Sequence, residues 1–518
     1  MIRHFIRSER AHLWYQRIQD LLWAAALITL PFTSFPLLVN LTGAIVAPLA
    51  AIPVFLLVLF RFIPYVLKRG TLPRESVPLL FFTLLALLAC ALAFFLDVPG
   101  YKGRTIPAQE LRALVTLVIG LAFFLIFSTL PQSETRLQKT LQWLTVGGII
   151  AMLWTLFQAY FIFRQADQYP AWMQIIQQWL VFTSPFFATP GSRVTGFTYE
   201  ASWFAHQMVM LYIPLWLAAS YQRTSAFRFR LLRLSLENIL LVLGVGLFFL
   251  TSPRIGLISF FLIGVFIFLK INLAILRRLV ASIAQRRWFQ NSRTQAPLRL
   301  VITLLTSGLL LLLYASALAA VIYFASQRDW RMALLVTNPP TWIEIKAFLT
   351  LQESVLLSFA HRLAFMERMV YWFTGWHVFN DHPWLGVGLG NAGFFALDQT
   401  PAIGWASFEI RSLLFRLPYL PNIKSLWVRL FAETGLLGFS MFFAWLVVLF
   451  RSAHLTLHSK QPTLQMIALT GQISLVALIG EGFSIDSFAM PYYWVAAGLI
   501  ASAGWVYRRR LLRSPTLP

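Results

Sequence analysis

The sequence is dominated by apolar runs of about 20 residues, and this feature restricts the chain to folds in which lipid is the solvent. The hydrocarbon core of a bilayer is roughly 30 Å thick, so a helix rising 1.5 Å per residue needs a run of about this length to cross it. Such runs predict an all-α polytopic membrane protein with about 12 transmembrane helices. They lie near residues 21–39, 43–67, 76–96, 111–130, 140–163, 201–221, 236–252, 254–273, 300–325, 430–450, 464–481 and 488–507.

Composition excludes a soluble globular protein. Charged residues make up 12% of the 518 residues, about half of the roughly 25% that a water-soluble domain carries on its surface. Cys90 is the single cysteine, which excludes a disulfide scaffold and a cysteine-based metal site.

The formal net charge of +23 would indicate nucleic acid in a soluble protein, but here its distribution indicates a membrane. If the N-terminus is cytoplasmic, the loops on that side hold 27 of the 42 basic residues and only five of the 19 acidic residues. Cytoplasmic loops of membrane proteins carry such an excess of lysine and arginine. We therefore predict that the N and C termini are cytoplasmic and that no nucleic acid is bound.

The loops divide the chain unequally. Residues 326–429, between predicted helices 9 and 10, form a long extracytoplasmic loop, far beyond ordinary connection lengths and therefore of the kind that carries function. Within this loop, apolar residues between Trp342 and Phe359 repeat at helical spacing and predict an amphipathic helix on the outer interface. We expect N-terminal helices and a first outer loop over 1–190, a core over 191–450, and two helices with a basic tail over 451–518.

Several cationic side chains fall at the outer ends of the predicted helices. Guanidinium groups bind phosphate through two parallel hydrogen bonds, so arginines that converge on one interface suit an anionic headgroup. The alternative is that these side chains only extend from helix ends towards water. The candidates for binding an anion are Arg193, Arg254, Arg368, Lys424 and Arg429.

The most polar and glycine-rich stretch is Asp381–Gly393. Gly388, Gly390 and Gly393 match G-x-G-x-x-G, but a dinucleotide fold also needs a strand and a βαβ unit, which the sequence does not supply here. These glycines, with Gly386, more simply let the backbone approach a ligand or other backbone in a tight loop.

Two acid–base candidates remain open. His382 could act as a general base near neutral pH, or it could be a turn residue before a proline. Glu433, at the mouth of a predicted helix, could be held there by the helix N-terminus, could orient arginines, or could take a proton from a sugar hydroxyl. Glu481 and Asp486 are expected to have helix-end roles of the same kind. Asp381 and His382 are too few ligands for a metal site, so we predict no metal.

Four motifs in this order resemble the O-antigen ligase and polymerase superfamily of bacterial envelope glycosyltransferases. The resemblance covers Ser192 to Phe439. Its motifs are Arg193-Val-Thr-Gly-Phe-Thr-Tyr-Glu-Ala-Ser, Leu250-Thr-Ser-Pro-Arg254, Asp381-His-Pro-Trp-Leu-Gly-Val-Gly and Leu430-Phe-Ala-Glu433-Thr-Gly-Leu-Leu-Gly438.

The resemblance implies an enzyme of the bacterial plasma (inner) membrane that works at the extracytoplasmic face without a cofactor. Members of the family pass a glycan from a polyprenyl diphosphate carrier to a hydroxyl of an acceptor glycan. The partners would be these two glycans, the lipid bilayer and possible polysaccharide assembly proteins. It implies catalytic or diphosphate-binding roles for Arg193, Arg254, His382, Lys424 and Glu433, and substrate-binding roles for Glu200, Arg368, Asp381, Gly386, Gly388 and Arg429.

The chain departs from the family pattern at three places. Lys424-Ser425 stands where ligase-like members carry His-Asn, which removes the histidine that activates the acceptor. Pro253 stands where many members have serine, and Glu200-Ala201-Ser202 is closer to the Glu-Pro-Ser of polymerase-like members. These departures favour a polymerase of a secreted or capsular polysaccharide over a ligase that acts on lipid A-core.

A polysaccharide flippase or secondary transporter is the main rival, because twelve helices suit it as well. Transporters tend to carry internal repeats and charged or broken-helix sites at the membrane midplane. This chain has no apparent repeat, and its polar motifs gather on one face. That arrangement favours surface chemistry over transport, and a non-catalytic scaffold ranks third.

Overall fold

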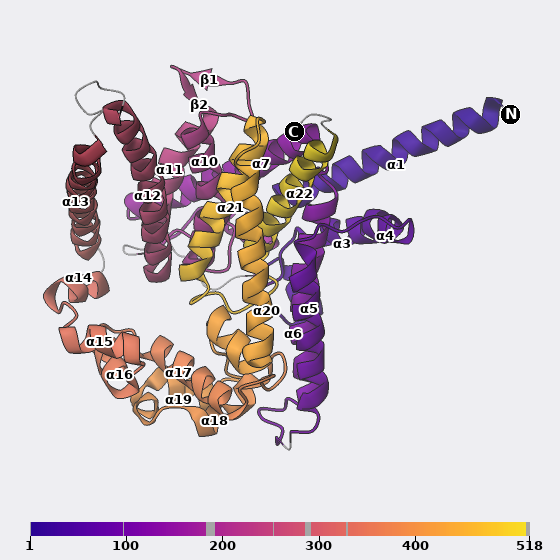
Figure 1. The fold of residues 1–518 in the computed structure, drawn as a ribbon. Coiled ribbons are helices and arrows are strands. Elements are labelled where there is room, and N and C mark those ends of the chain that lie inside the picture. Colours follow the sequence, from indigo (N-terminus) through magenta and orange to yellow (C-terminus); the bar gives the residue numbers. More distant parts are fainter. Residues whose placement is uncertain are drawn as a thin grey trace. The chain divides into compact units, whose positions relative to one another are not determined.

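The structure, a computed structural model, describes residues 2–96, 98–182, 192–251, 253–284, 292–327 and 330–513. These residues are mostly helical (Figure 1), as predicted. The strands among them are β1 (Arg230–Leu231) and β2 (Leu234–Ser235), which pair as a short antiparallel hairpin. The chain forms two compact units, the first made of residues 1–256 and 371–518 and the second of residues 257–370.

The first unit contains most of the helices. They are α1 (Ile2–Ile28), α2 (Pro36–Thr42), α3 (Ala51–Leu57), α4 (Ile63–Leu67), α5 (Ser76–Ala93), α6 (Ile106–Thr129), α7 (Glu134–Phe163), α8 (Ala171–Leu180), α9 (Ala201–Gln207), α10 (Ile213–Gln222), α11 (Leu236–Leu250), α18 (Ala396–Gln399), α19 (Phe408–Arg411), α20 (Leu426–Thr456), α21 (Pro462–Glu481) and α22 (Pro491–Arg513). The shorter helical turns are Val58–Phe62, Met208–Tyr212, Asn391–Phe395, Ala402–Ala406 and Ser412–Arg416.

Two further helices connect the units. They are α12 (Arg254–Ala284) and α17 (Met366–Asp381). The remaining helices belong to the second unit and are α13 (Ser292–Ser326), α14 (Trp330–Thr337), α15 (Trp342–Thr350) and α16 (Glu353–Arg362).

The core of the first unit lies around α21 and α22, which pack on each other and on α6, α10 and α20, and α20 in turn packs on α5 (Figure 1). Their apolar side chains are buried on nearly every face. Trp445 of α20 meets Trp494 of α22 with ring centroids 5.2 Å apart. A Cβ atom on Gly120 of α6 would lie 2.4 Å from the Trp494 indole. Only a glycine at this position leaves enough room for the indole ring. Small residues of this kind let neighbouring membrane helices approach closely.

Six of the described helical segments are long and apolar enough to cross a membrane. They are α5, α6, α7, α20, α21 and the Arg254–Ile275 part of α12. The other predicted runs also contain helix, but in shorter, interrupted or less apolar form. The number of twelve spans and their orientation therefore stay predictions.

Prolines explain where the predicted runs are interrupted. The run near 21–39 is not one helix, because α1 ends at Ile28 and α2 begins at Pro36. In two other runs, a wide turn precedes a proline, over Val58–Phe62 before Pro64 and over Met208–Tyr212 before Pro214. A proline ring clashes with the carbonyl four residues earlier, and a wide i→i+5 turn relieves that clash while the helix continues.

In the second unit, the amphipathic helix predicted near 342–359 is two helices. Leu351 has a positive φ of 50° and ends α15, and α16 starts at Glu353. A left-handed residue of this kind is a common way to end a helix. The α15 N-terminus has its own cap, in which Thr341 and Glu344 satisfy each other's backbone N–H groups.

Candidate functional site

The site is built on the start of α20, which is fixed to the end of α21. The Leu426 backbone N–H donates to the Gly482 carbonyl at 2.7 Å, and the Ser425 hydroxyl donates to the same oxygen at 3.2 Å. Ser425 also caps α20 by accepting from the Val428 N–H. This helix start is therefore a fixed platform for the residues that follow it.

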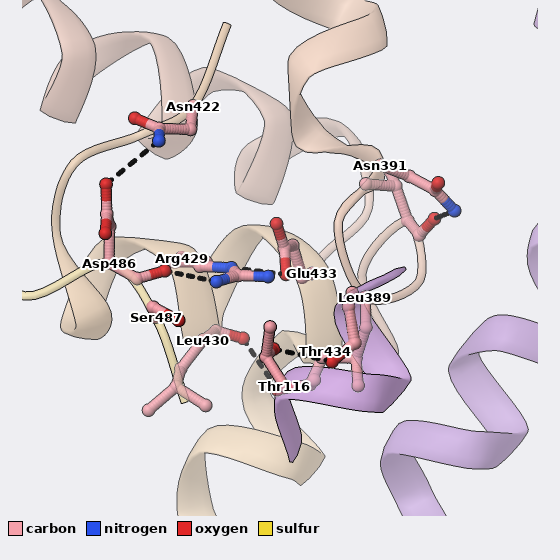
Figure 2. A network of polar contacts seen from close by, with 12 residues as sticks. Thr116, Leu389, Asn391, Asn422, Arg429, Leu430, Glu433, Thr434, Asp486 and Ser487 are labelled. Atoms are coloured by element: carbon pink, nitrogen blue, oxygen red, sulfur yellow. Dashed lines mark hydrogen bonds and ion pairs between the residues drawn. The ribbon is translucent and has the colours of Figure 1, made fainter. Parts of the chain in front are cut away.

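Arg429 and Glu433 form a buried ion pair one turn apart on α20. The Arg429 Nε donates to Glu433 Oε2 at 2.8 Å, and the two side chains are 12% and 5% exposed. Arg429 Nη1 donates to the Asp486 carbonyl oxygen, and the guanidinium lies over the Phe488 ring at 5.2 Å. Figure 2 shows Arg429 between Asp486 and Glu433. The contacts fix the orientation of both charged groups.

Asn422 extends this network towards solvent. Its side-chain Nδ2 donates to Asp486 Oδ2 at 2.9 Å, and Asn422 is exposed. We refer to Asn422, Arg429, Glu433 and Asp486 as the α20 polar cluster. Asp486 contacts two polar side chains of the cluster, and the helix-end role expected for it stays a prediction.

The glycine-rich stretch lies directly against α20, as the sequence predicted for backbone-to-backbone approach. The Val387 N–H donates to the Ala432 carbonyl and the Gly388 N–H to the Glu433 carbonyl, both at 3.0 Å. A Cβ atom on Gly386, whose φ is 66°, would lie 2.5 Å from the Ala432 carbonyl oxygen. The loop therefore packs directly on the α20 backbone at Ala432 and Glu433.

A kink at Gly435 completes the connection between loop and helix. Gly435 has φ 61° and ψ −168°, a conformation that is almost exclusive to glycine. Below the kink, the Leu436 and Leu437 N–H groups donate to the carbonyls of Pro383 and Trp384 at 2.8 Å and 3.2 Å. The backbone groups freed by the kink are thus satisfied by the loop.

A second buried carboxylate, Glu110 of α6, holds the other side of the loop. Asn391 Nδ2 donates to Glu110 Oε1 at 2.8 Å and to the Val387 carbonyl at 2.9 Å. Glu110 is 4% exposed. The sequence analysis did not identify Glu110 or Asn391, and the available signal was a carboxylate at the edge of an apolar run.

Lys424 lies beside the cluster but in its own set of contacts. Its Nζ is 3.1 Å from Glu409 Oε1 and 4.3 Å from the centroid of the Tyr371 ring. The Tyr371 hydroxyl donates to the same Glu409 oxygen at 2.7 Å. These contacts hold the Lys424 Nζ beside the α20 polar cluster, and a role in binding an anion or in removing a proton stays a prediction. Glu409 and Tyr371 were not identified from the sequence.

His382 occupies the turn that was one of its two predicted roles. Its backbone N–H donates to the Val378 and Phe379 carbonyls, and its carbonyl accepts from the Gly386 N–H at 3.1 Å. The ring packs against Phe395, with centroids 5.5 Å apart. Asp381, before it, accepts from Gln399 Nε2 at 2.6 Å. These contacts give Asp381 and His382 a structural role in the turn. A role of His382 in proton transfer stays a prediction.

The remaining predicted residues lie on other elements. Arg193 is exposed in the extended segment before α9, and Glu200 immediately precedes that helix, where its carboxylate accepts from the Ser202 hydroxyl. Burial, with the neighbouring Glu200 carboxylate, raises the pKa of Tyr199. Arg254 is half-buried at the first residue of α12; Ser252, in the same motif, lies outside the described residues. Arg368 is half-buried in α17, within the second unit.

A buried histidine–glutamate pair also went unrecognised in the sequence. His206 Nδ1 hydrogen-bonds to Glu481 Oε2, and both residues are almost fully buried. Glu481 immediately precedes Gly482, which anchors the start of α20. The pair therefore ties α9, and with it the Glu200 segment, to the end of α21. In the part of the chain that the structure describes, no three histidine, cysteine or acidic side chains are close enough to hold a metal ion.

Residues 239–443 match the model of a protein family described as O-antigen ligase. The resemblance to the O-antigen ligase and polymerase superfamily is confirmed. No curated protein matches the chain. The matched segment runs from α11 into α20, so it includes the α20 polar cluster up to Glu433 and the glycine-rich loop. Asp486, Arg193 and Glu200 lie outside it.

The O-antigen ligase family implies a glycosyl-transferring enzyme that acts on a lipid-linked glycan and an acceptor. Together with the six apolar helices, the match indicates a membrane protein. Most of the predicted site residues fall inside the matched segment. They are Arg254, Arg368, Asp381, His382, Gly386, Gly388, Lys424, Arg429 and Glu433.

Proposed function

We propose that this protein is a polysaccharide polymerase that transfers a glycan from a polyprenyl diphosphate carrier to a hydroxyl of an acceptor glycan at the extracytoplasmic face of the plasma membrane. The observation that supports it best is the buried Arg429–Glu433 pair under the glycine-rich loop, inside the segment that resembles O-antigen ligases. A carboxylate held in a fixed direction by an arginine suits an acceptor hydroxyl that must be oriented for attack.

In the proposed step, the acceptor oxygen attacks the anomeric carbon of the donor sugar and the bond from that carbon to the phosphate oxygen breaks. The polyprenyl diphosphate leaves with the bonding electrons, and Glu433 takes the hydroxyl proton. Arg429 keeps the Glu433 carboxylate in place. We assign the leaving diphosphate to Arg193, Arg254 and Lys424, because Arg429 is buried with Glu433 whereas Lys424 and its partner Glu409 are 27% and 54% exposed. Arg368, Glu200 and Asp381 would shape the surrounding substrate site.

Two features favour a polymerase over a ligase. The acceptor-activating histidine of ligase-like members is replaced by Lys424, which is engaged with Glu409. The Glu200-Ala201-Ser202 stretch is closer to the pattern of polymerase-like members. The alternatives are a ligase acting on lipid A-core and a polysaccharide flippase.

The test is transfer by the purified protein in nanodiscs, with defined polyprenyl-diphosphate oligosaccharides and no added nucleotide or metal. Product length on a gel separates the alternatives, because a ladder indicates a polymerase and one added block on a separate acceptor indicates a ligase. We expect Arg254→Lys to reduce transfer roughly tenfold or more, since lysine cannot make the paired hydrogen bonds of a guanidinium. Lys460→Gln, far from the site, is the control. If no product forms and the substrate crosses the membrane of sealed vesicles, the enzyme proposal is wrong and the protein is a flippase.

A further inference from the structure

The buried pair of His206 and Glu481 connects two parts of the site that are far apart in the sequence. His206 is in the last turn of α9, the helix that follows Glu200, and Glu481 is the last residue of α21. The two side chains are 4% and 0% exposed. They are too deeply buried to touch a substrate, so any effect of the pair on glycan transfer passes through the groups around it.

The pair has a directional role that apolar packing does not supply. His206 Nδ1 bonds to Glu481 Oε2, and no group in the described part of the chain bonds to the other carboxylate oxygen, Oε1. Well-packed apolar side chains are often as stabilising as a buried ion pair of the same volume. A hydrogen bond, in contrast, requires a particular distance and angle between its two groups. The pair therefore sets how the end of α9 lies against the end of α21.

A turn built on Glu481 leads from α21 into α22. The turn comprises residues 482–490, and the Ser484 and Ile485 N–H groups donate to the Glu481 carbonyl at 2.8 Å and 2.9 Å. The first residue of the turn, Gly482, accepts the two hydrogen bonds that fix the start of α20. A shift of Glu481 therefore moves the turn and the start of α20 together.

The same turn also holds Arg429. The Asp486 carbonyl accepts from the guanidinium, and the Phe488 ring centroid is 5.2 Å from it. The guanidinium in turn donates to the Glu433 carboxylate at 2.8 Å (Figure 2). A continuous series of contacts thus leads from His206 through the turn and Arg429 to Glu433.

A second contact joins α9 to the far end of the turn. Gln207 Oε1 accepts from the hydroxyl of Tyr492, at the start of α22, at 3.4 Å. Both side chains are fully buried. Helix α9 therefore contacts both ends of the turn, at Glu481 and at Tyr492, and holds it in place.

We propose that His206 is a positioning residue that aligns the donor side of the site with the acceptor side. This role rests on the proposed transfer, in which Arg193 and Glu200, before α9, belong to the donor side and Glu433 takes the acceptor proton. His206 ties the donor segment to the turn that orients Arg429 and Glu433. Without the tie, each side still binds its own glycan, but the attacking hydroxyl is no longer held in line with the anomeric carbon.

Hydrogen exchange of the full chain in nanodiscs tests the series of contacts without any substrate. We expect His206→Leu to exchange about tenfold faster than wild type over 426–433 and 482–486, because the turn has lost its tie to α9. His206→Asn should exchange like wild type, since the asparagine amide nitrogen takes the place of the imidazole Nδ1 and donates to the same oxygen.

The matched control is Glu75→Gln, which breaks another buried ion pair, that of Glu75 with Arg508 of α22. This variant should exchange faster at the start of α5 and like wild type over 426–433. It separates the loss of the tie from a general loss of stability, because both variants disrupt a buried carboxylate.

Transfer kinetics in the nanodisc assay then measure the alignment. We expect His206→Leu to lower kcat about tenfold and to leave KM for donor and acceptor within about twofold of wild type, because alignment is needed for the reaction and not for binding. His206→Asn should have nearly the kcat of wild type, and Glu75→Gln should leave kcat unchanged.

Wild-type exchange over 426–433 in His206→Leu would overturn the proposal, whether or not the protein transfers glycan. A higher KM with unchanged kcat would also overturn it, since the pair would then support only glycan binding. Exchange as expected but no transfer by wild type would overturn the proposed function and support the tie between α9 and α20. If His206→Leu does not fold, His206→Leu/Glu481→Gln removes the tie without leaving a buried charge unpaired, and the same outcomes decide.

Discussion

At the residue scale, the site depends on the buried ion pair between Arg429 and Glu433. Removing one charge of such a pair leaves the other desolvated and unpaired, which costs more than removing both. In the absence of Glu433, Arg429 retains the Asp486 carbonyl and the Phe488 ring as partners. These remaining contacts moderate the cost without replacing the lost charge.

We therefore predict that Glu433→Gln lowers the free energy of unfolding by about 3 kcal/mol, the lower end of the range for breaking a buried pair. Arg429→Met should have a comparable effect, and the double variant should be more stable than either single variant. Unfolding in mixed detergent micelles with increasing dodecyl sulfate measures all three. Effects of the single variants that simply add in the double variant would mean that the two charges do not depend on each other.

Gly435 is the second residue on which the site geometry depends. A Cβ atom there would lie 2.3 Å from the Trp384 carbonyl, in a backbone conformation that other residues rarely adopt. We predict that Gly435→Ala displaces the glycine-rich loop and abolishes transfer, with thermal unfolding in detergent shifted to lower temperature.

The matched control for this variant is Gly246→Ala in α11, where a Cβ atom would contact nothing within 4 Å. Replacing a glycine in the interior of a helix by alanine stabilises by roughly 0.5–1 kcal/mol, so this variant should unfold at the same or a higher temperature. Equal behaviour of the two variants would show that the kink is not required.

At the element scale, the α15–α16 pair is held by a carboxylate with several donors. The Thr341 backbone N–H, then the Thr341 hydroxyl and Arg362, lower the pKa of Glu344 from its ordinary value of 4.5. A group whose pKa is lowered by folding stabilises the fold above its ordinary pKa, and this contribution is lost as the pH falls towards the folded value. The connection between α15 and α16 should therefore loosen in acid.

We predict faster hydrogen exchange in α15 and α16 as the pH falls below about 4.5, after correction for the intrinsic pH dependence of exchange. Glu344→Gln cannot lose a charge, so at neutral pH it should already exchange faster than wild type and should show a flatter pH profile. An unchanged profile in this variant would assign the acid response to another group.

The elements also show what the sequence can and cannot predict. Apolar runs such as 76–96 and 111–130 were found as α5 and α6 because the membrane demands a minimum run of apolar residues. The break between Ile28 and Pro36 was missed, since two prolines inside an apolar run are also compatible with a kinked membrane helix. The division at Leu351 was missed because apolar spacing continues across it.

The candidate site was predictable only in its local parts. Arg429 and Glu433 are one helical turn apart in the sequence, and the glycines of the stretch Asp381–Gly393 predict that its backbone approaches other backbone closely. The partners Glu110 and Asn391 are separated by 281 residues, and His206 and Glu481 by 275 residues. Such pairs follow from how α6, α9 and α21 pack, which a single sequence does not specify.

At the scale of the whole molecule, the proposed chemistry requires the two ends of α20 to face opposite sides of the membrane, with the α20 polar cluster on the outer side. Helix α20 connects the two ends, with exposed Tyr419 before it and exposed Lys460 after it. The 21 residues of α20 after the Gly435 kink, 436–456, span about 31 Å, enough to cross the hydrocarbon core of a bilayer. Accessibility at these two positions therefore tests the orientation directly.

The single cysteine makes this experiment simple, because Cys90→Ser gives a cysteine-free background and Cys90 is buried. In spheroplasts, a membrane-impermeant maleimide should label Tyr419→Cys and leave Lys460→Cys unlabelled until the membrane is permeabilised. Cys90→Ser alone should remain unlabelled throughout. The reverse pattern would place Glu433 and Arg429 on the cytoplasmic side, where a polymerase using exported polyprenyl-diphosphate glycans has no substrate. Labelling of both positions in sealed spheroplasts would mean that α20 does not cross the membrane, and the positive-inside interpretation of the basic loops would fail with it.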